Sequence, residues 1–158
     1  MWSTIDQFFP NFASEGRRTG ALPGGQNRVM SDRVNVSSGS PYEPMIGFSR
    51  AVRVGDRVLV AGTAPVWPDG SVDPDPQVQA ARCLEIILGA LAEAGASAAD
   101  VVRTRMFLTD PADGDAVGKA HGAVFGEIRP AATMVIVAGL LDPRWKVEIE
   151  AEAFVTTP

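Results

Sequence analysis

The chain has very few of the residues that hold metal ions or form crosslinks. Its 158 residues include a single cysteine, Cys83, and a single histidine, His121. One cysteine excludes an intrachain disulfide and a zinc site built from several thiolates. A zinc site that used the one histidine would need carboxylates for its other ligands, and the sequence has no H-E-x-x-H spacing. We therefore predict no metal site.

Long apolar runs and an excess of positive charge are also missing. The longest apolar run is well short of the roughly 20 residues that span a bilayer. The opening stretch, "MWSTIDQFFPNF", lacks the basic and apolar regions of a secretory signal. The formal net charge of −5 argues against a surface that binds nucleic-acid phosphates. These absences predict a cytoplasmic protein with neither a membrane nor a nucleic acid as partner.

The composition that remains is that of one globular domain with an N-terminal extension. Hydrophobic residues make up 46% of the chain and charged residues 21%. Residues 1–40 are rich in Gly, Ser, Asn and Arg without periodicity, which predicts a flexible extension before a folded domain over residues 41–158. Because Met30 is a second candidate start, residues 1–29 are open to being a tail, a start-site artefact or an added, non-native segment. Their aromatic residues also leave docking on a surface open.

The folded part begins with two strands and a helix. The stretch "FSRAVRVGDRVLVAGTAPV" predicts two strands around Gly55-Asp56. Asp75-Pro76 is typical of a helix cap and first position, and Gly95 of a helix end. The helical spacing predicts a buried stripe of Ala81, Leu84, Ile87, Leu88 and Leu91.

A strand, a second helix and two more strands follow. In "DVVRTRMFLTD", alternation predicts one face with Val102, Thr104, Met106 and Leu108, and another with Arg103, Arg105 and Phe107. A helix beginning near Asp113–Asp115 carries His121 on its apolar side, which favours packing over a role as a base. The element order, β-β-α-β-α-β-β, predicts an α+β fold with two helices on one face of a sheet. The face of the sheet without helices would be exposed in a single chain, and contact with further copies of the chain is the simplest way to bury it.

Three carboxylates, Glu148, Glu150 and Glu152, alternate along the last predicted strand. Adjacent like charges on one strand face destabilise a sheet unless they are paired. A cross-strand ion ladder with Arg103 and Arg105 is one interpretation, and a chemical site is the other.

Four segments, "SRAVRVGDRVLVAGTAP", "VVRTRMFLTD", "RPAATMVIVAGLLDP" and "KVEIEAEAFV", resemble the RidA (YjgF) family, once labelled L-PSP endoribonucleases. The resemblance covers residues 41–155. It implies a chorismate-mutase-like fold and a homotrimer around a central barrel, with a cleft at each subunit interface. It also implies hydrolysis of reactive enamines and imines, such as 2-aminoacrylate, to keto acids and ammonia, without a cofactor.

The resemblance assigns roles to individual positions. Glu148 matches the glutamate associated with positioning the attacking water. Phe48 matches a pocket tyrosine but has no hydroxyl, and Gly62 matches the glycine ahead of the first pocket loop. Met134 stands at a position that is small or cysteine in the family, and the backbone of Thr133 is expected to line the pocket.

One position departs from the family's pattern. The arginine that binds the substrate carboxylate with two parallel hydrogen bonds is matched by Ala132. Its absence removes a charge-assisted pair worth about 1.5–3 kcal/mol. One possibility is that Arg105 fills this gap as a replacement. The preferred function is imine or enamine deamination of substrates larger or less anionic than 2-aminoacrylate. The alternative is a non-catalytic ligand-binding or regulatory trimer. An endoribonuclease is less favoured, given the acidic charge and the lone histidine.

Overall fold

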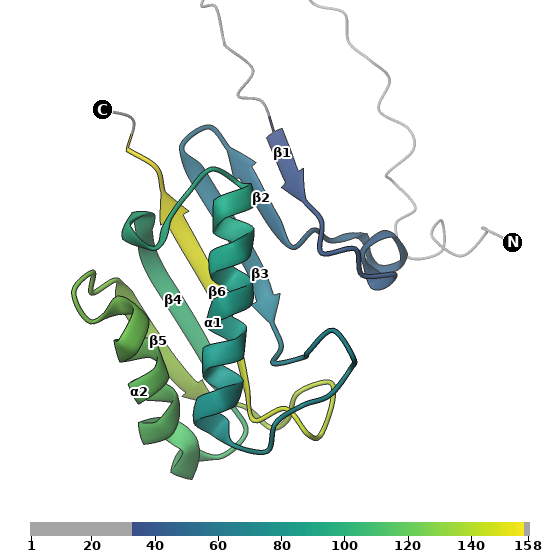
Figure 1. The fold of residues 1–158 in the computed structure, drawn as a ribbon, viewed down its shortest axis with the longest axis vertical. Coiled ribbons are helices and arrows are strands. Elements are labelled where there is room, and N and C mark those ends of the chain that lie inside the picture. Colours follow the sequence, from purple (N-terminus) through teal and green to yellow (C-terminus); the bar gives the residue numbers. More distant parts are fainter. Residues whose placement is uncertain (1–32, 157–158) are drawn as a thin grey trace, which may run out of the picture. The chain divides into compact units, whose positions relative to one another are not determined.

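The computed structural model describes residues 33–156, which form one six-stranded sheet with two α-helices (Figure 1). The strand order is β1-β2-β3-β6-β4-β5. All neighbouring strands are antiparallel except β4 and β5, which are parallel. The strands are β1 (Arg33–Val36), β2 (Ala51–Val54), β3 (Arg57–Thr63), β4 (Val101–Leu108), β5 (Ala131–Ile136) and β6 (Val147–Phe154). The predicted α+β class and element order are confirmed, with one strand added at the start.

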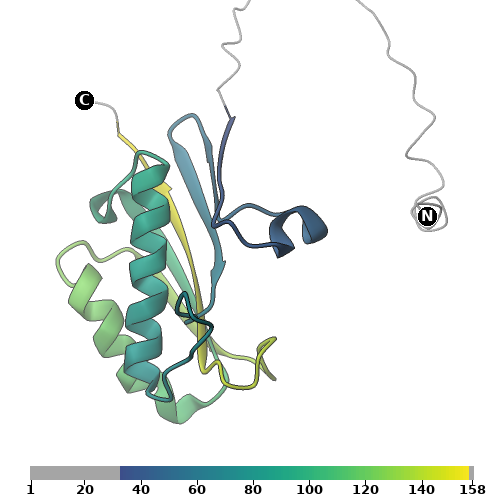
Figure 2. The same ribbon diagram turned by 45° about the vertical axis from the view of Figure 1, so that its right-hand side comes forward.

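Both helices lie against the same face of the sheet, as the two views show (Figures 1 and 2). Helix α1 spans Pro76–Glu93 and α2 spans Gly114–Phe125. The Asp75 side chain accepts hydrogen bonds from the backbone N–H groups of Gln77 and Val78, so the predicted cap is confirmed. Gly95 follows the helix with a φ of 74°, a left-handed conformation that glycine adopts without steric cost. The core lies between these helices and the inner face of the sheet.

The buried stripe of α1 differs from the prediction. Ala81 is exposed and Leu88 is only partly buried, whereas Gln79 is completely buried. The amide of Gln79 donates to the carbonyls of Asp73 and Arg144 and accepts from the backbone N–H of Lys146. Gln79 therefore joins the two loops at one end of the sheet. These contacts satisfy a buried polar group that apolar periodicity does not reveal.

Two strand predictions need correction. Residues Arg33–Val36 form β1, paired with β2, so the prediction of a flexible segment up to residue 40 is wrong for these four residues. The predictions for residues 1–29 lie outside the described part of the chain. On β4, Val102 is exposed rather than facing the helices, because the pairing with β6 shifts register between Val101 and Arg103.

The connection from β1 to β2 contains a short π-helical segment, Glu43–Gly47. The Glu43 carboxylate accepts hydrogen bonds from the Ser37 hydroxyl and from the backbone and hydroxyl of Ser38. These bonds, led by that of Ser37, hold the pKa of Glu43 below its ordinary value. Among the described residues, no helix is long and apolar enough to cross a membrane.

Candidate functional site around Glu148

The three glutamates of β6 lie on the sheet face opposite the helices. Val147, Ile149 and Ala151 alternate with them and are buried against the core. Because successive strand residues point to opposite faces, the glutamates share the open face. The predicted common face is confirmed.

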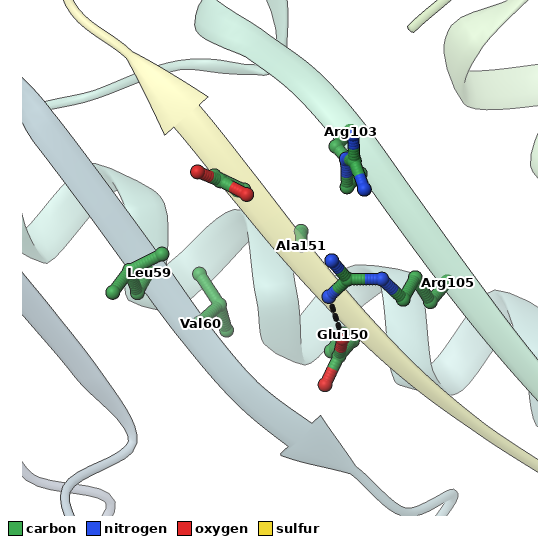
Figure 3. Close-up of a pocket in the computed structure, with 7 residues that line it drawn as sticks. Leu59, Val60, Arg103, Arg105, Glu150 and Ala151 are labelled. Atoms are coloured by element: carbon green, nitrogen blue, oxygen red, sulfur yellow. Dashed lines mark hydrogen bonds and ion pairs between the residues drawn. The ribbon is translucent and has the colours of Figure 1, made fainter. Parts of the chain in front are cut away.

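Two of these glutamates are paired with arginines. Arg105 on β4 forms an ion pair with Glu150, and Arg57 on β3 forms one with Glu152. Figure 3 shows the Arg105 guanidinium turned toward Glu150, with Arg103 further along the same strand. The predicted cross-strand pairing is confirmed for Arg105 with Glu150. For Glu152 the predicted partner on β4 is wrong, because Arg57 reaches it from the other neighbouring strand.

Glu148 differs from both of its neighbours on the strand. It forms no hydrogen bond or ion pair with any residue in the described range 33–156, and its side chain is half-buried. Burial raises the pKa of Glu148, and the charge of Glu150 raises it further, while the Arg50 guanidinium opposes the shift. A carboxyl with free oxygens and a raised pKa has the properties of a general base.

Gly62 on β3 lies directly against Glu148. The pairing of β3 with β6 is irregular between Val60 and Thr63, which places Gly62 within a bulge. A Cβ atom built on Gly62 would lie 2.2 Å from Oε1 of Glu148. Any larger residue at this position would therefore force the Glu148 carboxyl, the end of a flexible side chain, to move.

Arg50 is a third member of this cluster, and sequence reasoning did not identify it. Its Nη1 donates to the carbonyl of Gly62 at 3.0 Å, to Oγ1 of Thr63 at 2.6 Å and to the carbonyl of Ala61 at 3.4 Å. These bonds fix a half-buried guanidinium against the bulge that receives Glu148. The sequence pattern does not single out Arg50, because a polar residue directly before a strand is common and indicates no particular contact.

The residues without a predicted catalytic role are engaged in packing. Cys83 is fully buried, and burial raises the pKa of its thiol to about 12, so it remains protonated. Nε2 of His121 lies 2.9 Å from Oγ1 of buried Thr104, and its ring packs against Phe125. Burial lowers the pKa of His121. Within the described residues, no group of three or more His, Cys, Asp or Glu side chains is placed to hold a metal ion.

Comparison with known proteins identifies the family. The family model described as endoribonuclease L-PSP matches residues 39–155. The chain belongs to this family, the RidA (YjgF) family. A crystal structure of a Mycobacterium tuberculosis member of the YjgF/YER057c/UK114 family is similar with a TM-score of 0.73 at 46% identity, covering 78% of this chain and 100% of that one. The chorismate-mutase-like fold is thereby confirmed.

Two curated relatives carry names that describe an activity. The 3-aminoacrylate deaminase RutC of Acinetobacter baylyi is 32% identical over 128 residues, which are 80% of this chain and 100% of that protein. The 2-iminobutanoate/2-iminopropanoate deaminase of Salmonella typhimurium is 35% identical over 111 residues, 67% of this chain and 85% of that protein. The family therefore includes enamine and imine deaminases.

The remaining positions assigned from RidA proteins lie in two different parts of the sheet. Phe48 lines a groove with Ser49, Leu59 and Ala61, next to the bulge at Gly62. Ala132, Thr133 and Met134 lie on β5, the edge strand, which is exposed along its whole length.

The register of β5 decides which face each of its residues occupies. Ala132 pairs with buried Thr104, so Ala132 and Met134 lie on the helix side of the sheet. Thr133 pairs with Arg105 and lies on the open face with Glu148. Within one chain, Ala132 and Glu148 are thus on opposite faces. The guanidinium of Arg105 is bonded to Glu150. The role of Arg105 as a replacement for the missing arginine stays a prediction.

Proposed function

We propose that the protein hydrolyses small imines and enamines to carbonyl compounds and ammonia, with Glu148 as the base. The observation that carries the proposal is that Glu148 is half-buried and unpaired within the described residues, with a raised pKa, while Glu150 and Glu152 are neutralised by arginines. The names of the two deaminating relatives support the same reaction class.

The proposed reaction needs one base and one water molecule. An enamine first tautomerises to the imine. Glu148 accepts a proton from water as the water oxygen bonds to the imine carbon, and the C=N electron pair moves to nitrogen, which takes up a proton. In the resulting carbinolamine the hydroxyl group loses its proton to solvent as the C=O bond forms, which replaces the proton that nitrogen took from solvent, and the C–N bond breaks to release ammonia. The proton taken by Glu148 returns to the departing nitrogen.

We infer that the functional form is a homotrimer with the ligand in clefts between subunits. Ala132 and Glu148 lie on opposite faces of the sheet in one chain, so a site that contains both positions needs a second copy. The exposed edge strand β5 and the uncovered face of the sheet are available for this contact. Light scattering is expected to give three times the chain mass of 16.7 kDa. A mass of one chain would contradict this assembly.

A second candidate, a ligand-binding trimer without catalysis, is favoured by one observation, the alanine at position 132. An assay separates the two functions. An imino acid is generated in situ from its amino acid by an oxidase, and ammonia release is followed with and without the purified protein. Acceleration of release above the protein-free rate is expected. Binding of the product keto acid without any acceleration would favour the second candidate instead.

A further inference from the structure

The guanidinium of Arg50 is held firmly by one of its nitrogens while the others remain available. Nη1 makes all of its contacts, with the carbonyls of Ala61 and Gly62 and with the Thr63 hydroxyl. Nε and Nη2 donate to no group within the part of the chain that the structure describes. Thr63 is itself fixed, because its hydroxyl donates to the carbonyl of Ala61. Arg50 is therefore anchored in one orientation with unused donors.

No carboxylate of the described residues occupies those donors. Glu43 and Glu148 are near enough to favour the charged form of Arg50, but neither forms an ion pair with it within 4.0 Å. The oxygens of Glu43 are already bonded to Ser37 and Ser38. Neither Nε nor Nη2 of Arg50 is among the buried polar atoms that lack a partner in the described residues, so both donors are open to solvent and to a ligand carboxylate.

The position of Arg50 suits one class of ligand. Arg50 bonds the carbonyl of Gly62, and Oε1 of Glu148 occupies the space that a Cβ of the same residue would need. In a 2-imino acid the carboxylate is bonded directly to the imine carbon. An arginine and a base that meet at one glycine can therefore hold the carboxylate and direct water to that carbon together. Two parallel N–H donors match a carboxylate in a way that a lysine cannot.

We propose that Arg50 binds the carboxylate of a 2-imino acid or 2-oxo acid beside Glu148. Arg50, the residue directly before β2, would then supply the cation that is absent at Ala132. This inference rests on the proposed function for its substrate class. It reverses the expectation from Ala132 alone, because it makes small anionic imines good substrates. It also gives Arg50 a role in specificity rather than in proton transfer.

A binding measurement tests Arg50 without requiring catalysis. Pyruvate, an unreactive 2-oxo acid, is titrated by calorimetry into the full-length wild type and into Arg50→Gln and Arg50→Lys. The affinity of Arg50→Gln is expected to fall about ten- to hundredfold, which is the loss for a charge-assisted pair. Arg50→Lys keeps the positive charge but lacks the two parallel N–H donors, so its affinity is expected to lie between those of the wild type and Arg50→Gln. The control, Arg57→Gln, removes an arginine that pairs with Glu152 and is expected to bind as the wild type does.

Kinetics give a second readout that a merely structural role would not produce. For an imino acid, Arg50→Gln is expected to raise KM about ten- to hundredfold with kcat nearly unchanged. For an uncharged imine of similar size, kcat/KM is expected to fall at least about tenfold less than for the imino acid, because only the imino acid loses a partner for its carboxylate. A loss of equal size on both substrates would overturn the proposal, since it would indicate a damaged fold.

Different results would reject the proposed deaminase function and the proposed role of Arg50. No pyruvate binding to the wild type, or equal binding to wild type and Arg50→Gln, would overturn the role of Arg50 even if deamination is observed. Loss of pyruvate binding in Arg50→Gln, in a protein that releases no ammonia, would support Arg50 and reject the deaminase. If Arg50→Gln does not fold, unchanged affinity in Arg50→Lys would overturn the proposal.

Discussion

Replacing Glu148 with glutamine is expected to lower kcat for imine hydrolysis by about 10²–10⁴-fold, the usual contribution of a positioned general base. Glutamine has nearly the same shape and fits against Gly62, but it cannot accept a proton from water. Because the carboxyl forms no hydrogen bond or ion pair with the described residues, the substitution removes no structural contact there. The measurement is ammonia release under saturating imine.

Glu152→Gln is the matched control for this variant. It makes the same chemical change on the same strand face, but at a glutamate that pairs with Arg57. Its kcat is expected to stay within about twofold of the wild type, because an ion pair with a largely exposed arginine contributes little. Equal rates for Glu148→Gln and the wild type would reject Glu148 as the base.

Replacing Gly62 with alanine is expected to lower kcat/KM about a hundredfold. The added methyl group would lie 2.2 Å from Oε1 of Glu148, so either the carboxyl or the bulge must move. A displacement of about 1 Å in a reacting group costs on the order of a hundredfold in rate. The carbonyl of Gly62 also anchors Arg50, so movement of the bulge would disturb both side chains.

Gly89→Ala provides the control for the added methyl group. Gly89 lies within α1, and a Cβ there would meet nothing within 4 Å. Alanine in a helix interior is expected to stabilise the fold by up to about 1 kcal/mol and to leave the rate unchanged. Full activity in Gly62→Ala would show that Glu148 does not work from the position seen here.

The elements that sequence alone predicted well are those with strong local signals. Alternation placed β4 and β6, and the Asp75-Pro76 pair placed the start of α1. The missed features depend on contacts between distant segments. Gln79 is buried because two loops converge on its amide, and Val102 is exposed because a register shift turns it outward. Apolar periodicity records neither cause.

The candidate site was predictable in part, for a related reason. Alternation put three glutamates on one face, but which of them lacks a partner depends on arginines from two other strands. The resemblance to RidA proteins singled out Glu148 and Gly62. It gave no reason to consider Arg50, whose contacts reach across to the bulge of β3. An arginine before a strand carries no sequence signal for such a contact.

The central claim is that Glu148 is an unpaired, half-buried carboxyl whose pKa is raised by its surroundings. The most direct test is an NMR titration of the glutamate side-chain carboxyl carbons, with the Glu148 signal assigned by its loss in Glu148→Gln. A raised pKa keeps the carboxyl protonated to higher pH. The carboxyl therefore ionises, and becomes able to accept a proton, at a higher pH than an ordinary glutamate. We predict a midpoint for Glu148 above the ordinary glutamate value of 4.5. A midpoint at or below 4.5 would contradict the account.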